Sequence, residues 1–300
     1  MKQKSPLLLF FFLIFSLNTL SAQDFLVTYM DGRADLKAGN AWQPLKLGAR
    51  LSDASVVRLG DKSLLECRRT GAVITISRPG IYALKDLTRP AARLRTGNPL
   101  ASIDKKIRQV AGDEEGRRRK YAAMGVRGRA IDDDSGPEFV DSEPFDPVAP
   151  GVDLLDEGQY DQAVAYFKDE LKNSPDQATE AILAYYLVYA YNRNNQNALA
   201  LKQADQMDIP PQHALYPDYV LLKGRLLYMS FDYDGALALF NTYLSHQPRG
   251  DAAQPALLLS AYCYQGKGDK IQQKEVLQKA VTLDPQSDVG REAAELLKKL

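Results

Sequence analysis

Apolar and polar residues alternate in short runs between residues 25 and 87, and turn residues separate the runs. The runs recur roughly every eight to twelve residues, and no segment with helical spacing interrupts them. This pattern is typical of an all-β sandwich or roll. The expected strands cover residues 25–29, 34–36, 42–47, 56–59, 63–67, 72–76 and 81–84, with turns at Asp31-Gly32, Gly39-Asn40, Gly60-Asp61, Thr70-Gly71 and Pro79-Gly80.

The carboxy-terminal half has apolar positions at helical spacing and repeats its own pattern. Two copies with identical intervals contain Tyr160, Ala163, Phe167 and Pro175, and Tyr233, Ala236, Phe240 and Pro248. We expect the tyrosine to pack at a turn between two helices and the alanine to let those helices approach. The phenylalanine would fill the space between them, and the proline would end the second helix. Gly224 is the expected small residue of a first helix.

These intervals resemble those of the tetratricopeptide repeat family, over residues 149–285. The resemblance implies an all-α solenoid of helical hairpins at residues 151–286, closed by a capping helix at 287–300. A weaker copy contains Ile182, Tyr185, Tyr186, Tyr189 and Ala198, and a further copy contains Leu257, Ala261, Tyr264, Leu277, Ala280 and Pro285. The first repeat departs from the family pattern, because its leading helix is short and prolines precede it.

In this family the inner face of each first helix lines a concave groove. With the register placed on Ala198, Ala236 and Ala280, the residues expected there are Glu180, Leu183, Leu187, Tyr191, Asp218, Leu221, Arg225, Tyr228, Met229, Leu258 and Tyr262. Such a mixture of aromatic, aliphatic and charged groups suits an extended or helical peptide of a protein partner. The alternative is that this face packs against the capping helix or the β domain.

The amino terminus has the layout of a secretory signal. Lys2 and Lys4 precede an apolar run from Leu7 to Leu17, and the small residues Ser21-Ala22 follow before Gln23. The run is short for a membrane span, which needs roughly 20 apolar residues. We therefore expect a signal peptide at residues 1–22 and export to the periplasm or cell envelope of a bacterium. A retained membrane anchor is the alternative.

The β segment is similar to the FecR-type domain of bacterial envelope proteins. The motifs that carry this resemblance are Tyr29-Met30-Asp31-Gly32, Trp42-Gln43-Pro44-Leu45, Gly48-Ala49-Arg50-Leu51, Asp53-Ala54-Ser55-Val56-Val57, Ser63-Leu64-Leu65-Glu66, Gly71 and Gly125-Val126-Arg127-Gly128. The resemblance implies a periplasmic β interaction domain at residues 25–131. The relay to a sigma factor that is known in this family needs a cytoplasmic segment, and about half a dozen residues precede the apolar run. We therefore do not expect that relay here.

Charge changes this picture only locally. The chain contains 38 basic and 38 acidic residues, a balance that argues against bulk nucleic-acid binding. Residues 89–129 carry a net charge of +8, including the run Arg117-Arg118-Arg119-Lys120, for which a solvated helix face is the favoured interpretation. Residues 132–150 are rich in acid and proline and are expected to be a linker.

Candidate catalytic chemistry is sparse. His213 and His246 lack the partners of a known metal or catalytic motif, and Cys67 and Cys263 are expected to be buried free thiols. No phosphate-binding loop or nucleophile elbow occurs, so no enzymatic activity, cofactor or metal is expected.

The sequence thus favours an exported envelope scaffold that binds protein partners through the repeats. A second partner or an envelope component would bind the β domain, nucleic acid would not bind, and contact with the membrane would require a retained signal. The alternatives are a membrane-anchored, FecR-like sensor or regulatory subunit, and an enzyme or carbohydrate-binding wall protein.

Overall fold

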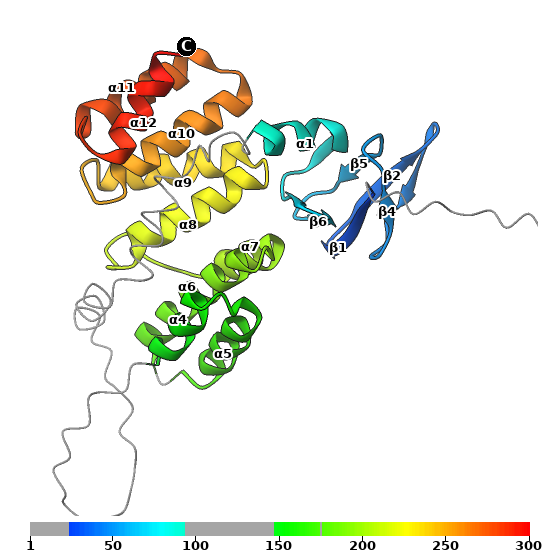
Figure 1. The fold of residues 1–300 in the computed structure, drawn as a ribbon, viewed down its shortest axis with the longest axis horizontal. Coiled ribbons are helices and arrows are strands. Elements are labelled where there is room, and N and C mark those ends of the chain that lie inside the picture. Colours follow the sequence, from blue (N-terminus) through cyan, green and yellow to red (C-terminus); the bar gives the residue numbers. More distant parts are fainter. Residues whose placement is uncertain (1–23, 94–146, 175) are drawn as a thin grey trace, which may run out of the picture.

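The computed structural model describes residues 24–93, 147–174 and 176–300, and all structural statements concern these residues. They form an amino-terminal β domain and a carboxy-terminal stack of helices (Figure 1). The expected signal peptide, the basic run at 117–120, the Gly125–Gly128 motif and most of the acidic linker lie outside the described residues.

The β domain consists of two four-stranded antiparallel sheets, with strand orders β4-β1-β6-β7 and β3-β2-β5-β8. The strands are β1 (Phe25–Asp31), β2 (Ala34–Ala38), β3 (Ala41–Pro44), β4 (Arg50–Leu51), β5 (Val56–Leu59), β6 (Leu64–Arg69), β7 (Ala72–Ile76) and β8 (Gly80–Ala83). The prediction of a β-rich amino-terminal region is confirmed, because each expected strand has a counterpart. The short β4 was not predicted.

Both sheets contribute to one apolar core. Phe25 and Leu65 from the first sheet are fully buried, as is Val57 from the second. Helix α1 (Leu84–Arg93) follows β8 directly and adds Leu84 and Leu87 to this core. The sequence pattern had placed Leu84 at the end of a strand and predicted no helix here. The two leucines lie three residues apart, a spacing that puts them on one helix face.

Asp35 is buried and forms a cross-strand ion pair with the half-exposed Arg58 on the second sheet. Asp35 on β2 is opposite Arg58 on β5, and its carboxylate accepts hydrogen bonds from the Arg58 guanidinium at 2.7 and 3.1 Å. These hydrogen bonds lower the pKa of Asp35 from its usual value, although burial opposes the shift. The guanidinium also lies over the Trp42 ring, 4.6 Å from its centroid.

We predict that Asp35→Asn destabilises the protein at pH 7 and that the deficit shrinks in acid. A carboxyl group whose pKa is lowered by folding stabilises the native state above its unfolded pKa of about 3.9. That contribution is lost as the pH falls through the folded pKa. Urea unfolding at pH 7 and pH 3 measures the difference, with Asp61→Asn on an exposed turn as the control. An equal deficit at both pH values would contradict the prediction.

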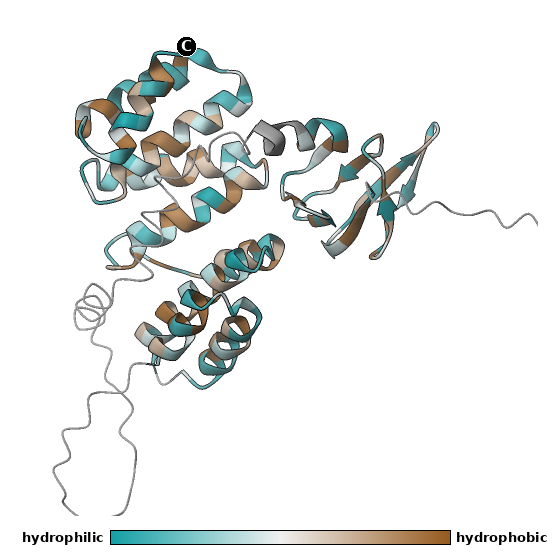
Figure 2. Ribbon diagram, in the orientation of Figure 1, coloured by the Kyte–Doolittle hydropathy of each residue, from teal (hydrophilic) through white to brown (hydrophobic). Residues whose placement is uncertain are grey.

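The helical part contains four hairpins and a final helix in the described residues. Its helices are α4 (Ala149–Asp156), α5 (Tyr160–Lys172), α6 (Gln177–Arg193), α7 (Asn197–Gln206), α8 (Tyr216–Met229), α9 (Tyr233–His246), α10 (Ala253–Lys267), α11 (Lys270–Leu283) and α12 (Asp288–Leu297). Brown segments of α8 and α10 in Figure 2 mark their apolar residues. Buried residues on these two helices form part of the apolar core of the helical stack. A helical, tetratricopeptide-like carboxy-terminal region is therefore confirmed.

Glycines allow the two helices of a hairpin to approach. A Cβ atom on Gly224 of α8 would lie 2.2 Å from Cε1 of Phe240 on α9, and one on Gly151 of α4 would lie 2.3 Å from Cζ of Phe167 on α5. Phe167 and Phe240 are both fully buried. The roles predicted for Gly224 and for the two phenylalanines are thus seen in the structure.

The turns inside the hairpins share one backbone conformation. A residue with positive φ stands at each turn: Gly158 (75°), Asn195 (58°), Phe231 (64°) and Gly268 (75°). The residue that follows each of them occupies the N-cap position of the second helix, and these residues are Gln159, Gln196, Asp232 and Asp269. These turns fix how the four hairpins align.

This alignment corrects the register predicted for the second hairpin. The fourth residue after each cap is buried, and these residues are Ala163, Ala200, Ala236 and Gln273. The equivalent of Ala236 is therefore Ala200, not Ala198, in the second hairpin, and Gln273, not Ala280, in the fourth. The sequence could not distinguish Ala198 from Ala200, because α7 carries small residues at both positions and both are buried.

Candidate interaction site

Most residues expected to line the groove are buried in the helical core. Leu183, Leu187, Tyr191, Leu221, Leu258 and Tyr262 are at most 8% exposed. Asp218 is buried as well. Of the eleven residues, Glu180 is exposed, and Arg225, Tyr228 and Met229 are partly exposed. In the second hairpin the corrected register changes which residues are predicted, but it does not make them accessible. The equivalents of Leu221 and Arg225 there are Tyr185 and Tyr189, which are also buried. Leu221 and Leu258 are buried because the neighbouring helices cover them.

Two of the partly exposed residues, Arg225 and Tyr228, belong to a line of side chains that crosses four helices, and Met229 lies next to Tyr228 in the sequence. Arg225 on α8 donates from Nη1 to Oδ1 of Asn192 on α6 at 2.9 Å. One turn further along α8, the Tyr228 ring lies 6.1 Å from the Tyr262 ring on α10. The Tyr262 hydroxyl donates to Oε1 of Glu292 on α12 at 2.5 Å. We call these five residues the cross-repeat ladder.

Burial sets the electrostatic character of this ladder. It raises the pKa of Tyr262, and the hydrogen bond to Glu292 raises that pKa further. Burial also raises the pKa of Tyr228. Both phenols therefore stay protonated at neutral pH, and they can serve as hydrogen-bond donors rather than anions. Asn192 and Glu292 were not predicted, and Asn195, at the turn that follows α6, is the sequence signal that would have aligned Asn192.

A second set of contacts joins the β domain to the hairpin turns. Leu64 of β6 packs against the helical core, and Phe231 of the third hairpin packs against the core of the β domain. Polar contacts surround this exchange: Arg68 Nη2 to Asn195 O at 2.6 Å, Ser77 Oγ to Ser230 Oγ at 2.8 Å, Lys202 Nζ to Asp31 Oδ2 at 2.7 Å and Arg78 Nη1 to Asp234 Oδ2 at 2.6 Å. The β domain (blue to cyan) accordingly lies on one flank of the stack in Figure 1.

Glu66 is the central polar residue of this interface. It is 2% exposed, and its Oε2 accepts a hydrogen bond from the backbone amide of Ala198 at 3.0 Å. Its Oε1 accepts hydrogen bonds from Arg68 Nε at 2.9 Å and from Thr28 Oγ1 at 3.3 Å. A carboxylate at this point also interacts favourably with the positive end of the α7 dipole.

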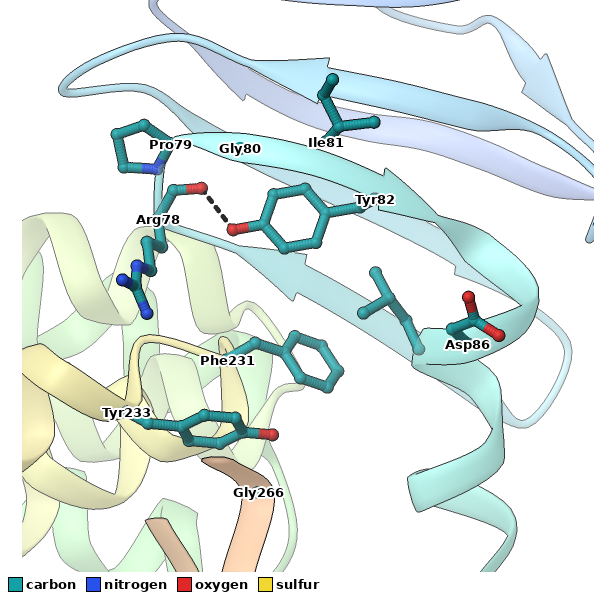
Figure 3. A pocket seen from close by; sticks show the side chains of 10 residues that line it. Arg78, Pro79, Gly80, Ile81, Tyr82, Asp86, Phe231, Tyr233 and Gly266 are labelled. Atoms are coloured by element: carbon teal, nitrogen blue, oxygen red, sulfur yellow. Dashed lines mark hydrogen bonds between the residues drawn. The ribbon is translucent and has the colours of Figure 1, made fainter. Parts of the chain in front are cut away.

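Two clefts open along the same interface. One has a volume of about 480 Å³ and lies between Tyr82 and Leu87 of the β domain and Phe231 and Tyr233 of the third hairpin (Figure 3). The Tyr82 hydroxyl donates to the Arg78 carbonyl at 2.7 Å at its edge. A second cleft, of about 610 Å³, is lined by Leu64 and Ser77 and by residues of α7, α8 and α9. The interface therefore leaves room for solvent or a ligand beside its packed centre.

The described residues contain no cluster of side chains suited to hold a metal ion. No group of three or more His, Cys, Asp or Glu side chains converges in the part of the chain that the structure describes. Cys67 and Cys263 are buried free thiols in different domains. Burial raises the pKa of Cys67 to about 12 and also raises that of Cys263, which keeps both thiols protonated and unreactive at neutral pH.

No described helix combines the length and apolar character that crossing a membrane requires.

Comparison with known families supports the helical part. Residues 254–287, which span α10 and α11, match the family model of the tetratricopeptide repeat. The carboxy-terminal region contains a tetratricopeptide repeat. No curated protein matches the chain. The comparisons provide no evidence for a FecR-type domain, so the tetratricopeptide part of the expected architecture is the part that they support.

Three solved structures are similar to about half of the chain. A MamA double mutant of RS-1 is 20% identical and is matched over 51% of this chain and 89% of its own, with a TM-score of 0.41. YrrB, described as a TPR protein with an unusual peptide-binding site, is 20% identical and is matched over 51% of this chain and 73% of its own, with a TM-score of 0.42. MamA 41-end from Desulfovibrio magneticus RS-1 is 21% identical and is matched over 51% of this chain and 90% of its own, with a TM-score of 0.40.

Proposed function

We propose that this chain is an exported, non-catalytic adaptor of the bacterial cell envelope. Its tetratricopeptide region recognises a segment of a protein partner, and its β domain acts as a FecR-type interaction module. The tetratricopeptide-like fold itself suggests a protein–protein interaction scaffold. The export signal and the motifs of the β segment are the sequence features that favour the envelope.

The cross-repeat ladder is the observation that carries this proposal. Its members come from four helices, and each is held by a neighbour on the next helix. Arg225, Tyr228 and Met229 are exposed in part, so a partner can reach a guanidinium, an aromatic ring and a thioether on one helix. Arginine and aromatic residues are the side chains that most often dominate binding energy at protein interfaces.

Preorganisation supports the same conclusion. Arg225 already donates to Asn192, and Tyr228 already contacts Tyr233 and Tyr262, with ring centroids 5.8 and 6.1 Å apart. Side chains that are ordered before binding lose less conformational entropy when a partner docks. A carboxylate or a backbone carbonyl of a peptide suits Arg225, and an apolar side chain suits Tyr228 and Met229.

We predict that Arg225→Ala and Met229→Glu each weaken capture of the main partner from envelope extract by at least tenfold. The first change removes a charged donor, and the second places a carboxylate on the apolar part of the surface. Partner capture by immobilised protein, quantified by mass spectrometry and followed by affinity measurement on the purified partner, checks this result. Tyr262 is not substituted, because its burial would confound binding with stability.

The matched control is Arg249→Ala, which removes an exposed charge from the loop between α9 and α10. It should leave capture unchanged. Circular dichroism should give the same helix content for all variants. Equal capture by wild type, Arg225→Ala and Met229→Glu would overturn the assignment of the ladder as the binding surface.

A further inference from the structure

The hairpin turns that contact the β domain differ in sequence from those that do not. At the positive-φ position the first and fourth turns have Gly158 and Gly268, and a Cβ atom there would meet nothing within 4 Å. The second and third turns have Asn195 and Phe231 instead. Positive φ is least favourable for a bulky side chain such as phenylalanine.

The β domain contacts these two unusual turns. Arg68 donates to the Asn195 carbonyl, and Phe231 packs against the β-domain core. The strained conformation of Phe231 therefore places its ring in contact with the other domain. A glycine at this position would relieve the strain and would lose the contact.

Helix α7 shows a second dependence on the β domain. Asp232 and Asp269 cap α9 and α11 by accepting hydrogen bonds from Gly235 N and Gln272 N. Gln196 occupies the equivalent position before α7 and makes no such bond. The amide of Ala198 is bound instead by Glu66, from strand β6. The β domain thus supplies the cap that the second hairpin lacks.

Charge pairs connect the same domain to successive hairpins. Asp31 binds Lys202 on α7, and Arg78 binds Asp234 on α9. Asp234 also binds Lys267 at the end of α10, so the Arg78 contact reaches the fourth hairpin indirectly. Exposed pairs of this kind contribute little stability, but their geometry restricts how the hairpins can shift relative to one another.

We propose that the β domain is an intramolecular splint for the second and third hairpins. Glu66 caps α7 and Phe231 anchors the next turn, so docking holds α6–α7 and α8–α9 at one fixed angle. Arg225 and Asn192 lie on these two hairpins, so docking also sets the shape of the cross-repeat ladder. Any partner that displaces the β domain would loosen that surface. The inference concerns contacts within the chain and holds whatever partner the ladder binds.

Amide hydrogen exchange of the full chain tests the cap. In Glu66→Ala the Ala198 amide should exchange about tenfold faster, as expected for the loss of a helix cap. Exchange should also accelerate at the third turn, residues 230–235, because the splint connects the two hairpins. Glu66→Gln keeps an oxygen acceptor and should show a smaller effect, which guards against a variant that simply unfolds.

A compensating substitution separates capping from docking. In Glu66→Ala/Gln196→Asp the second hairpin has its own cap, as the third and fourth hairpins do. By analogy with Gly235 and Gln272, the Leu199 amide should gain protection at the start of α7, whereas the two domains should stay less firmly docked. Spin labels at Lys46→Cys and Lys274→Cys, both on exposed sites, report the distance between the domains. The native thiols stay unlabelled, because they are buried and protonated.

The two non-glycine residues with positive φ at the hairpin turns, Phe231 and Asn195, provide a matched pair of substitutions. Phe231→Gly should broaden the distribution of label distances, although it relieves backbone strain. Asn195→Gly relieves the same kind of strain and keeps the carbonyl that Arg68 binds, so the distances should not change. If the distances between the spin labels stayed narrowly distributed in both Phe231→Gly and Glu66→Ala, the splint proposal would be wrong. Faster amide exchange in Glu66→Ala that was confined to Ala198 would also contradict it.

Discussion

Replacing Phe240 with alanine is expected to lower the free energy of unfolding by about 4 kcal/mol. Its ring is fully buried between α8 and α9, and it fills the space that Gly224 leaves open. Truncation removes apolar contacts and leaves a cavity, because two helices that are held by neighbours on both sides cannot close it. Urea unfolding followed by circular dichroism measures the loss.

Phe167→Ala is the matched substitution in the first hairpin. Phe167 is equally buried and has the same relation to Gly151 that Phe240 has to Gly224. Its hairpin has a short leading helix and, among the residues that the structure describes, a neighbouring hairpin on one side only. Repeats contact mainly their neighbours, so Phe167→Ala should unfold the first hairpin alone, before the rest of the chain. If Phe240→Ala had the same urea midpoint of unfolding as the wild-type protein, the proposed core packing would be wrong.

Gly224→Val is expected to destabilise the protein by about 3 kcal/mol. The Cβ atom alone would overlap the Phe240 ring, which lies 2.2 Å from its position. The ring cannot move away, since it is fully buried, so α8 and α9 must separate. The midpoint of thermal or urea unfolding measures this effect.

Two further variants isolate the steric cause. Ala238→Val on the exposed side of α9 introduces the same valine side chain into a helix without a clash, and its lower helix propensity should reduce stability by less than about 1 kcal/mol. Phe240→Leu in the Gly224→Val background removes the atoms that clash and should recover part of the loss. A double variant no more stable than Gly224→Val would show that the effect does not arise from this contact.

The proposed function and the splint lead to different expectations for the same surface. Arg225→Ala removes a binding group and leaves the domain interface intact. Glu66→Ala leaves every ladder residue in place and loosens the hairpins that carry them. The first change should reduce binding at any temperature. The second should reduce binding most under conditions in which the domains separate, such as high salt, because ion pairs surround the interface.

Local patterns predicted the secondary structure well. Alternating apolar residues and turn dipeptides predicted the strands, since each depends on residues a few positions apart. The spacing from Tyr233 to Phe240 and the small Gly224 predicted the hairpins. The prediction failed at α1, where burial of Leu84 and Leu87 by the β core selects a helix. It also failed in the second hairpin, where Ala198 and Ala200 are both small and buried and the turn at Asn195 determines the register.

The sequence by itself determined that a β-rich domain precedes a helical repeat region, because strand and hairpin patterns arise from local spacing and backbone preferences. Only the tertiary structure decided which residues are accessible. Leu221 and Leu258 have equivalent, suitable positions on α8 and α10, yet neighbouring helices cover them. Only the tertiary structure brought Glu66 to Ala198 and Arg225 to Asn192, across 132 and 33 residues of sequence. Contacts of that kind depend on how whole elements pack, and no local pattern encodes them.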